Sequence, residues 1–254
     1  MTFLDRSQQP IRFGDFEAKS PLLYPSVKMM GGVFVSPLKA IMEILPEGPY
    51  RPLQVSPTHG LVGLHCMEYV DSDIGPYNEV SLAIGVQKKS ALPLSGIKIL
   101  KSLLTNRFEG RVMDLPVTTE IALQGGVEVY NYPKYLADIS YRETKNYRIC
   151  TVRDRESQDL IVEFDGRKLE TKHPSRPNLD FHNYPEKAGR HLHARVEINR
   201  CQSATSFFLP HARIRIGSHP HSAVYQRLQL GILMQYFFVP EAEAVLYPPE
   251  AFNG

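Results

Sequence analysis

Residues 120–134 read EIALQGGVEVYNYPK, and the last three of them form a corner that fixes the direction of a lysine. Proline locks its own φ angle and pushes the preceding residue, Tyr132, into an extended conformation. Lys134 therefore leaves the corner along a defined path. A nucleophilic amine needs such a stiff mount, together with apolar or aromatic neighbours that favour its neutral form.

The spacing Glu-x-Ala-x-x-x-Gly-x-Glu-x-x-x-Tyr-Pro-Lys within residues 120–134 resembles the acetoacetate decarboxylase family. Two further segments agree with the family in order and spacing. Tyr77-Asn78-Glu79, followed by Ala83-Ile84, is similar to the family's Tyr-x-Glu strand, and Leu45-Pro46-Glu47-Gly48 is similar to a turn that ends an early helix. The resemblance extends from about residue 36 to residue 141.

This resemblance implies a cone-shaped β-barrel with Lys134 inside it as the Schiff-base amine. It also implies that Glu79 brings a carboxylate to the lysine, as a second catalytic residue that orients the substrate or moves a proton. Tyr132 and Tyr77 are the expected aromatic neighbours and candidate substrate-binding residues. Family members assemble through their barrels, so the resemblance further implies a homo-oligomer.

The chain departs from the family pattern at three positions of the expected pocket. Tyr135 stands where the family has a second lysine directly after the first. No arginine is in register on the N-terminal strand, so Lys28 is the nearest cation. A gapless alignment places Leu64 where the family has a second pocket glutamate, and Glu68 shares a strand face with Leu64. We therefore expect Lys28 and Glu68 to be substrate-binding residues.

Two strands are predicted over residues 60–70 and 77–87. In the second, Val80, Leu82, Ile84 and Val86 alternate to one face, which we expect to be buried. The opposite face carries side chains that become smaller away from Glu79: Tyr77, Glu79, Ser81, Ala83 and Gly85. Space is thereby left beside the carboxylate. The alternation alone favours a face that is turned to solvent or covered by a helix, but the resemblance of Tyr77-Asn78-Glu79 to the family's strand implies a pocket wall, which is our prediction.

The remaining pattern indicates short strands with few helices. A helix is predicted to begin at Ser36-Pro37 and end at Pro46, and another to run from Thr118 or Thr119 to Gln124, with Gly125-Gly126 as its stop. Further strands are expected at residues 136–141, 147–152, 160–164, 193–198 and 207–216, and residues 225–235 fit either a helix or a strand. The polar residues 165–190 are predicted to be a long loop or lid. The fold class is thus mainly β (α+β), an antiparallel cone-shaped barrel with a few short peripheral helices and a single domain over residues 1–254.

Composition argues against several other classes of protein. The formal net charge is +2, and no basic stripe interleaved with aromatic residues is visible, so nucleic acid is not an expected partner. Cys66, Cys150 and Cys201 are odd in number and far apart, so neither a disulfide framework nor a zinc motif is predicted. No signal sequence or membrane span is evident, so we expect a cytoplasmic protein without a membrane partner.

Histidines offer a rival chemistry. His191-x-His193-x-x-x-Glu197 resembles the first motif of the cupin barrels, which hold a metal with two imidazoles and a carboxylate. The glycines that bracket that motif are replaced by Pro185 and Ala204, and a second motif is missing. A metal-dependent barrel of this kind, or a non-catalytic small-molecule binder, is therefore the more distant alternative.

These observations favour a cofactor-free carboxy-lyase that forms a Schiff base between Lys134 and a small keto acid, acetoacetate or a related β-keto acid. A protonated imine accepts the electron pair that is released when the carboxylate leaves as CO2. The closest alternative keeps the same lysine and performs an aldol condensation, a dehydration or a C–C hydrolysis on another keto compound.

Overall fold

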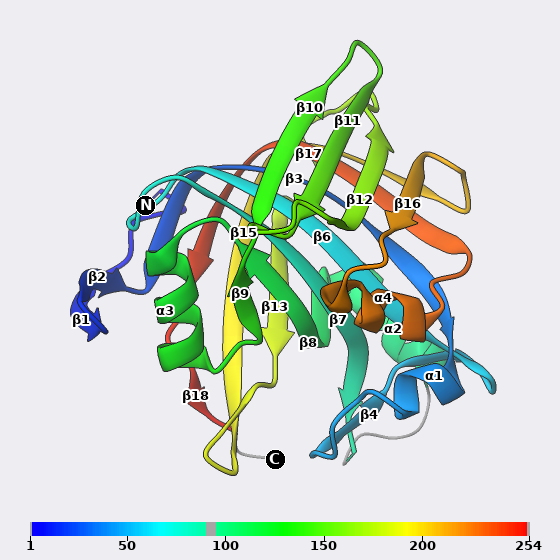
Figure 1. Ribbon diagram of the computed structural model, residues 1–254, viewed down its shortest axis with the longest axis horizontal. Helices are drawn as coiled ribbons and strands as arrows, with labels where there is room; N and C mark the ends of the chain where they lie inside the picture. Colours follow the sequence, from blue (N-terminus) through cyan, green and yellow to red (C-terminus); the bar gives the residue numbers. More distant parts are fainter. Residues whose placement is uncertain (1, 90–94, 253–254) are drawn as a thin grey trace.

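The computed structural model describes residues 2–89 and 95–252, and in these residues seven strands close a barrel (Figure 1). In spatial order the strands are β7 (Tyr77–Lys88), β6 (His59–Asp71), β3 (Leu22–Pro37), β17 (Leu233–Leu246), β15 (Arg190–Phe207), β13 (Asn178–Asn183) and β8 (Arg107–Val117). Strand β8 also pairs with β7, which completes the ring. Neighbours are antiparallel except β13 and β8. The prediction of a mainly antiparallel barrel is confirmed.

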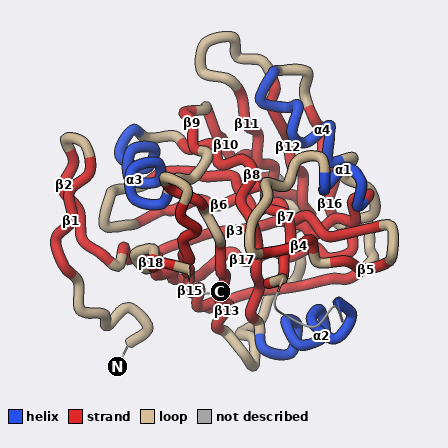
Figure 2. Tube along the Cα trace, turned by 90° about the horizontal axis from the view of Figure 1, so that it is seen from below, coloured by secondary structure: helices blue, strands red, loops and turns tan. Residues whose placement is uncertain are grey.

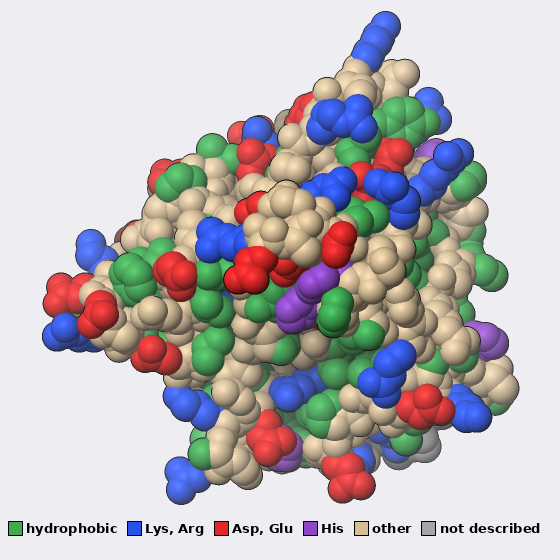
Figure 3. Space-filling model, in the orientation of Figure 1, with side chains coloured by type: hydrophobic (Ala, Val, Ile, Leu, Met, Phe, Trp, Pro, Cys, Tyr) green, Lys and Arg blue, Asp and Glu red, His purple; other side chains and the backbone are tan. Residues whose placement is uncertain are grey.

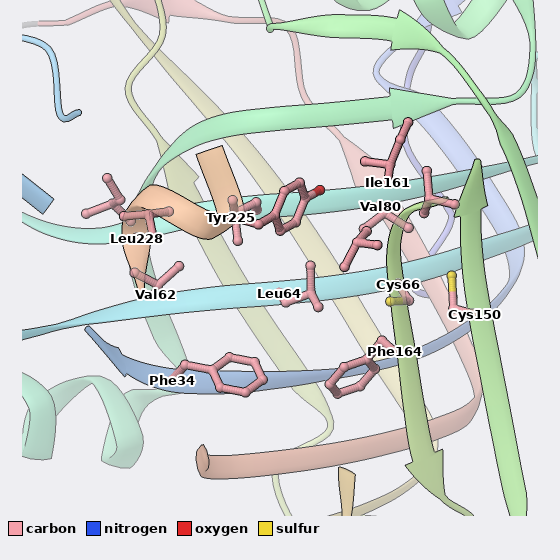
Figure 4. Packing of buried hydrophobic residues seen from close by; sticks show 14 of the residues in the cluster. Phe34, Val62, Leu64, Cys66, Val80, Cys150, Ile161, Phe164, Tyr225 and Leu228 are labelled. Carbon is pink, nitrogen blue, oxygen red and sulfur yellow. The ribbon is translucent and has the colours of Figure 1, made fainter. Parts of the chain in front are cut away.

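A second sheet covers one outer side of the barrel. It consists of β10 (Asp138–Glu143), β11 (Tyr147–Arg153), β12 (Leu160–Arg167) and β16 (Ala212–Ile216). Outward-facing residues of β6 and β7, such as Leu64 and Val80, pack with Phe164 and Ile161 of this sheet in one buried apolar cluster (Figure 4). Because successive side chains of a strand alternate between its faces, the residues between these core positions point into the barrel.

The helices lie around the periphery of the strands (Figure 2). They are α1 (Leu38–Met42), α2 (Ser95–Thr105), α3 (Glu120–Tyr130), the short 3-10 helix at Pro220–Ser222, and α4 (Ala223–Leu228). Helix α1 ends before the predicted stop at Pro46. Ser36 does not cap it, because its hydroxyl donates to the carbonyl of Leu228.

Short strands extend the two sheets or stand beside them. The hairpin of β1 (Gln9–Phe13) and β2 (Phe16–Ser20) stands apart from the barrel at the left of Figure 1. Strands β4 (Tyr50–Pro52) and β5 (Gln54–Ser56) pair with β7 and β6, while β14 (Glu186–Lys187) and β18 (Glu250–Ala251) pair with β15. Strand β9 (Lys134–Leu136) runs parallel to β8 and begins at the lysine singled out above.

The expected helix stop at Gly125-Gly126 was wrong. Helix α3 continues through both glycines to Tyr130 and ends at Asn131, whose φ of 53° is left-handed. The glycines instead permit close approach, since a Cβ at Gly125 would lie 3.0 Å from the Phe13 ring.

The expected loop over residues 165–190 was also wrong in about half of its length. Strand β12 reaches Arg167, and β13 is a wall of the barrel. Its Leu179 and Phe181 face the interior of the barrel. Pro177 and Pro185 lie on either side of the strand and do not interrupt it.

Two other segments are divided by turns. Residues 208–211 separate β15 from β16 within the predicted strand 207–216. The ambiguous residues 225–235 contain the end of α4 and the start of β17.

Helices that could span a membrane are absent among the described residues. On the face shown in Figure 3, lysine and arginine side chains are interspersed with acidic ones.

A carboxylate, Asp114 of β8, is buried between the barrel and the outer elements. Its Oδ2 accepts hydrogen bonds from the hydroxyls of Tyr225 in α4, at 2.7 Å, and Tyr135 in β9, at 3.2 Å. Burial raises the pKa of Asp114 to about 7, although the two hydrogen bonds oppose the shift. The folded protein therefore keeps this proton over a pH range in which an exposed aspartate has lost it.

We expect Asp114 to make the fold less stable as the pH rises from about 4 to about 7, because over that range the unfolded chain releases a proton that the folded chain retains. Asp114→Asn removes this titration. Its thermal midpoint, relative to that of the unmodified protein, should rise by several degrees between pH 5 and pH 8, measured by circular dichroism. Asp71→Asn, at the exposed end of β6, is the matched control. Parallel midpoint curves for Asp114→Asn and the unmodified protein would contradict the assignment.

Candidate functional site

Lys134 and Glu79 form an ion pair inside the barrel. The Lys134 Nζ lies 2.7 Å from the Glu79 Oε2, and the two side chains are 7% and 10% exposed. The hydroxyl of Tyr69 donates to the other carboxylate oxygen at 3.4 Å, and the ring centroid of Tyr77 lies 5.9 Å from the Nζ. The expected amine and carboxylate are thus brought together, 55 residues apart in sequence.

Strand pairing explains why they meet. Glu79 is paired with Val117 of β8, and Lys134 is paired with Leu115 of the same strand. Leu115 and Val117 are two residues apart, so their side chains share one face of β8. Glu79 and Lys134 therefore flank β8 on the same face, one from each side.

Helix α3 crosses the stem of the lysine at Gly126. A Cβ at that glycine would lie 2.3 Å from the Lys134 Cδ and 2.4 Å from its Cε. Such distances are far shorter than a normal contact between carbon atoms. The lysine can hold its position only because residue 126 has no side chain.

A cluster of tyrosines stands beside the ion pair. Tyr69 lies between Tyr24 and Tyr77, with its ring tilted against both and ring centroids 4.5 Å from each, and the Tyr24 and Tyr77 hydroxyls are 3.3 Å apart. Burial raises the pKa of all three phenols, and the nearby Glu79 carboxylate adds to the rise. These hydroxyls are therefore neutral and available as hydrogen-bond donors at ordinary pH.

Tyr132 forms a second aromatic wall. Its ring stacks on Tyr130 at a centroid distance of 5.3 Å with nearly parallel planes. Burial raises the pKa of both phenols. Tyr132 and Tyr77 thus lie where the sequence placed candidate substrate neighbours, around the same cavity as Lys134.

The cavity has a volume of about 470 Å³ and occupies the barrel interior. The predicted pocket wall is part of its lining, from Tyr77 and Glu79 through Ser81 and Ala83 to Gly85. A volume of this order is typical of pockets that hold small organic ligands.

His65 is a cavity residue that the sequence analysis did not identify. Its ring lies 5.5 Å from that of Phe181 and 5.7 Å from that of Phe237, centroid to centroid. Enclosure lowers its pKa to about 4, so the imidazole is neutral at ordinary pH. The sequence pattern that could have identified His65 is the alternation along β6. Its odd-numbered residues Gly63, His65, Met67 and Tyr69 all line the cavity.

Lys28 and Glu68 lie on the opposite face of their strands. Glu68 pairs with Arg148 of the outer sheet, whose side chain is 2% exposed, and with Lys28 at 3.8 Å. The inward-facing residues nearest to Lys28 are Val27 and Met29. Neither Lys28 nor Glu68 is therefore located where we expected a substrate contact.

Leu64 and Tyr135 point away from the cavity as well. Leu64 belongs to the outer apolar cluster (Figure 4), and Tyr135 is directed to Asp114. The positions at which the chain departs from the expected pattern thus do not face Lys134.

The rival metal motif is not assembled. Within the described residues, no group of three or more histidine, cysteine, aspartate or glutamate side chains is placed to hold a metal ion. Glu197 is engaged by Arg195 and by the Tyr247 hydroxyl, at 2.6 Å, while His193 contacts His182 at 2.7 Å. Four residues along a strand separate Glu197 from His193 by about 13 Å.

Comparisons with known proteins agree with this architecture. The family model for acetoacetate decarboxylase matches residues 9–224. No curated protein matches the sequence. A structure from structural studies of acetoacetate decarboxylase is similar to the chain with a TM-score of 0.65 at 14% identity, over 94% of this chain and 91% of that chain.

Two further solved structures share the fold. Acetoacetate decarboxylase from Legionella pneumophila gives a TM-score of 0.61 at 12% identity, over 92% of this chain and 87% of that chain. The enduracididine biosynthesis enzyme MppR, complexed with the condensation product of pyruvate and imidazole 4-carboxaldehyde, gives 0.62 at 10% identity, over 91% and 88%. Since the family model covers most of the sequence, the chain belongs to the acetoacetate decarboxylase family.

Proposed function

We propose that this protein is a Schiff-base-forming decarboxylase that acts on acetoacetate or a related β-keto acid through Lys134. The observation that carries the proposal is the buried amine of Lys134, which is hydrogen-bonded to Glu79 and opens onto a cavity of ligand size. Such a nucleophile, held beside a group that accepts its proton, is the arrangement used for covalent catalysis with carbonyl substrates.

The proposed reaction consumes one proton, taken from water, and no other reagent, since the water lost on imine formation is regained on hydrolysis. The neutral amine attacks the keto carbon, and loss of water gives a protonated imine. The carbon–carbon bond to the carboxylate then breaks, and its electron pair moves into the imine. CO2 is released, and an enamine remains on Lys134. A proton returns to the enamine carbon, and water hydrolyses the resulting imine to release a ketone and free Lys134.

Glu79 is suited to move protons in this sequence. Its Oε2 is in direct contact with the Lys134 Nζ, so it can accept a proton from the amine and return one to the departing water. The Tyr69 hydroxyl on the other oxygen holds the carboxylate in place. Tyr77 and Tyr132 enclose the reacting centre with aromatic surface.

A second candidate function uses the same imine for carbon–carbon bond formation. Lys28, the cation that we expected to bind the substrate, lies outside the cavity, and the guanidinium of the cavity residue Arg200 donates to the carbonyls of Pro177 and Arg176. MppR, which shares the fold, holds a condensation product. An enamine of Lys134 that attacks an aldehyde would need no clamp for a leaving carboxylate.

Borohydride should trap an adduct on Lys134 when the protein is incubated with acetoacetate or acetylacetone, because reduction converts the imine into a stable secondary amine. Peptide mass spectrometry locates the added mass. Lys134→Arg keeps a cation beside Glu79 but should lose the adduct entirely, whereas Lys145→Arg in the exposed turn between β10 and β11 should keep it. Labelling spread over surface lysines would refute the proposal. Release of CO2 from acetoacetate then distinguishes decarboxylation from condensation with an added aldehyde.

Glu79→Gln should slow adduct formation at Lys134 by about 10²-fold, since the amide cannot accept the proton of the amine. The rate is measured by quenching with borohydride at successive times. Glu68→Gln is the matched control, because Glu68 lies on the far side of the sheet. Circular dichroism verifies the folding of both variants. Equal rates for Glu79→Gln and the unmodified protein would remove Glu79 from the mechanism.

Gly126→Ala should displace the lysine and lower the rate of adduct formation by at least tenfold, because the new methyl group overlaps the Lys134 stem. Gly96→Ala in α2 is the control, since a Cβ there meets open space. Unchanged labelling in a folded Gly126→Ala protein would show that the stem can be repositioned without loss.

A further inference from the structure

The cavity extends much further than a four-carbon keto acid requires. Its wall follows β7 from Glu79 to Gly85, which is about 20 Å along an extended strand. The inward side chains beyond Glu79 are Ser81 and Ala83, and Gly85 has none. Opposite them, Gly110 and Val112 of β8 are also small. Space is therefore kept open along the strand, away from the ion pair.

The neighbouring wall has matching chemistry. The described cavity residues of β6 are Leu61, Gly63, His65, Met67 and Tyr69, and none of them is charged, because burial keeps His65 neutral. Met29 and Val33 of β3 continue this surface. Methionine side chains are unbranched and flexible, so they adapt to a ligand with many conformations.

An apolar chain is the ligand that such a surface would bind. Water in a cavity lined by aliphatic and aromatic groups finds few hydrogen-bond partners, and an alkyl chain replaces it with favourable burial. Acetoacetate beside Lys134 would leave most of the 470 Å³ without a ligand contact. The charged and hydrogen-bonding groups at the ion pair would meet only the keto end of the molecule.

We propose that the natural substrate of Lys134 is a β-keto acid or ketone with an extended unbranched alkyl chain, and that this chain lies along β7 from Glu79 towards Gly85. The inference rests on the proposed Schiff-base chemistry for the keto end, and on the shape and lining of the cavity for the chain. Ala83, about 13 Å from Glu79 along the strand, is the position at which a larger side chain would block it.

Two measurements separate chain binding from imine formation. The first uses 1-dodecanol, which has the chain but no carbonyl group. It should raise the thermal midpoint of the unmodified protein and of Lys134→Arg alike, because a ligand of the folded state stabilises it. Ala83→Leu should abolish this increase. Ala223→Leu, at an exposed position of α4, is the matched control and should retain it.

The second measurement compares 2-undecanone with 2-butanone, each kept below its solubility limit and trapped on Lys134 with cyanoborohydride. Burial of each additional methylene strengthens binding by about fourfold, so the longer ketone should reach half-maximal labelling at a concentration at least tenfold lower. Ala83→Leu should remove this advantage, so that the two ketones reach half-maximal labelling at similar concentrations.

The outcomes distinguish the two proposals. If both ketones reach half-maximal labelling of Lys134 at the same concentration, and dodecanol does not change the thermal midpoint, the chain inference is overturned and the Schiff-base proposal stands. If dodecanol stabilises the protein and Ala83→Leu abolishes this effect, the chain site is supported even when no ketone is trapped on Lys134. Failure to trap any ketone on Lys134 would overturn the proposed function. Absence of both responses would overturn both proposals.

Discussion

The pairing of β7 with β8 is the constraint on which the rest of the structure depends. It closes the ring of strands and gives the barrel an interior. It also fixes the register of β7, so that Glu79 is paired with Val117, two residues from Leu115, the residue of β8 that is paired with Lys134. The catalytic geometry that we propose is therefore a property of strand register, and it does not depend on a flexible loop. Side chains mounted on paired strands are held more rigidly than side chains on surface loops.

A buried ion pair is a costly way to stabilise a fold. Removing an ammonium and a carboxylate from water costs several kcal/mol each, and well-packed apolar residues are often at least as stable in the same place. The barrel nevertheless encloses Lys134 and Glu79 and surrounds them with phenols that remain neutral. Retention of such a pair beside an open cavity is better explained by chemistry than by stability. Gly126 supports the same view, because a glycine inside a helix is less stable than an alanine, and here its missing side chain leaves room for Lys134.

The alternation of side chains, together with the resemblance of Tyr77-Asn78-Glu79 to the family's strand, predicted the wall of the cavity along β7, and a short motif was sufficient to predict its lysine and carboxylate. The β6 and β3 walls could not be predicted as well, because a strand assignment that is wrong by one residue exchanges its two faces. Glu68 was misplaced because the gapless alignment put Leu64 in the pocket, whereas both residues share the outer face of β6. Lys28 was named only as the nearest cation, and His65 was missed. A register shift between Ser26 and Val27 shows how local irregularity defeats simple counting.

Other errors concerned elements whose sequence gives a misleading local signal. Gly125-Gly126 is typical of a helix end, yet α3 runs through both residues and packs them closely against Phe13 and Lys134. Strand β13 contains only two apolar residues, Leu179 and Phe181, and its most buried side chain is the polar His182. In both cases the element packs against partners outside its own segment, such as Phe13 for α3 and β8 for β13, about which local propensity carries no information.

The neighbours in the barrel ring also determine the order in which the molecule can be assembled. The segment from β6 to β9 contains both Glu79 and Lys134. The strands that bring them together, β7, β8 and β9, follow one another in the sequence. Strand β3, however, needs β17 as its second neighbour, and about 200 residues separate the two. During synthesis from the N-terminus, Lys134 and Glu79 therefore emerge long before β17, the last strand of the ring in the sequence. Until β17 arrives, β3 presents an open edge, so the last barrel strand protects the first from pairing with other chains.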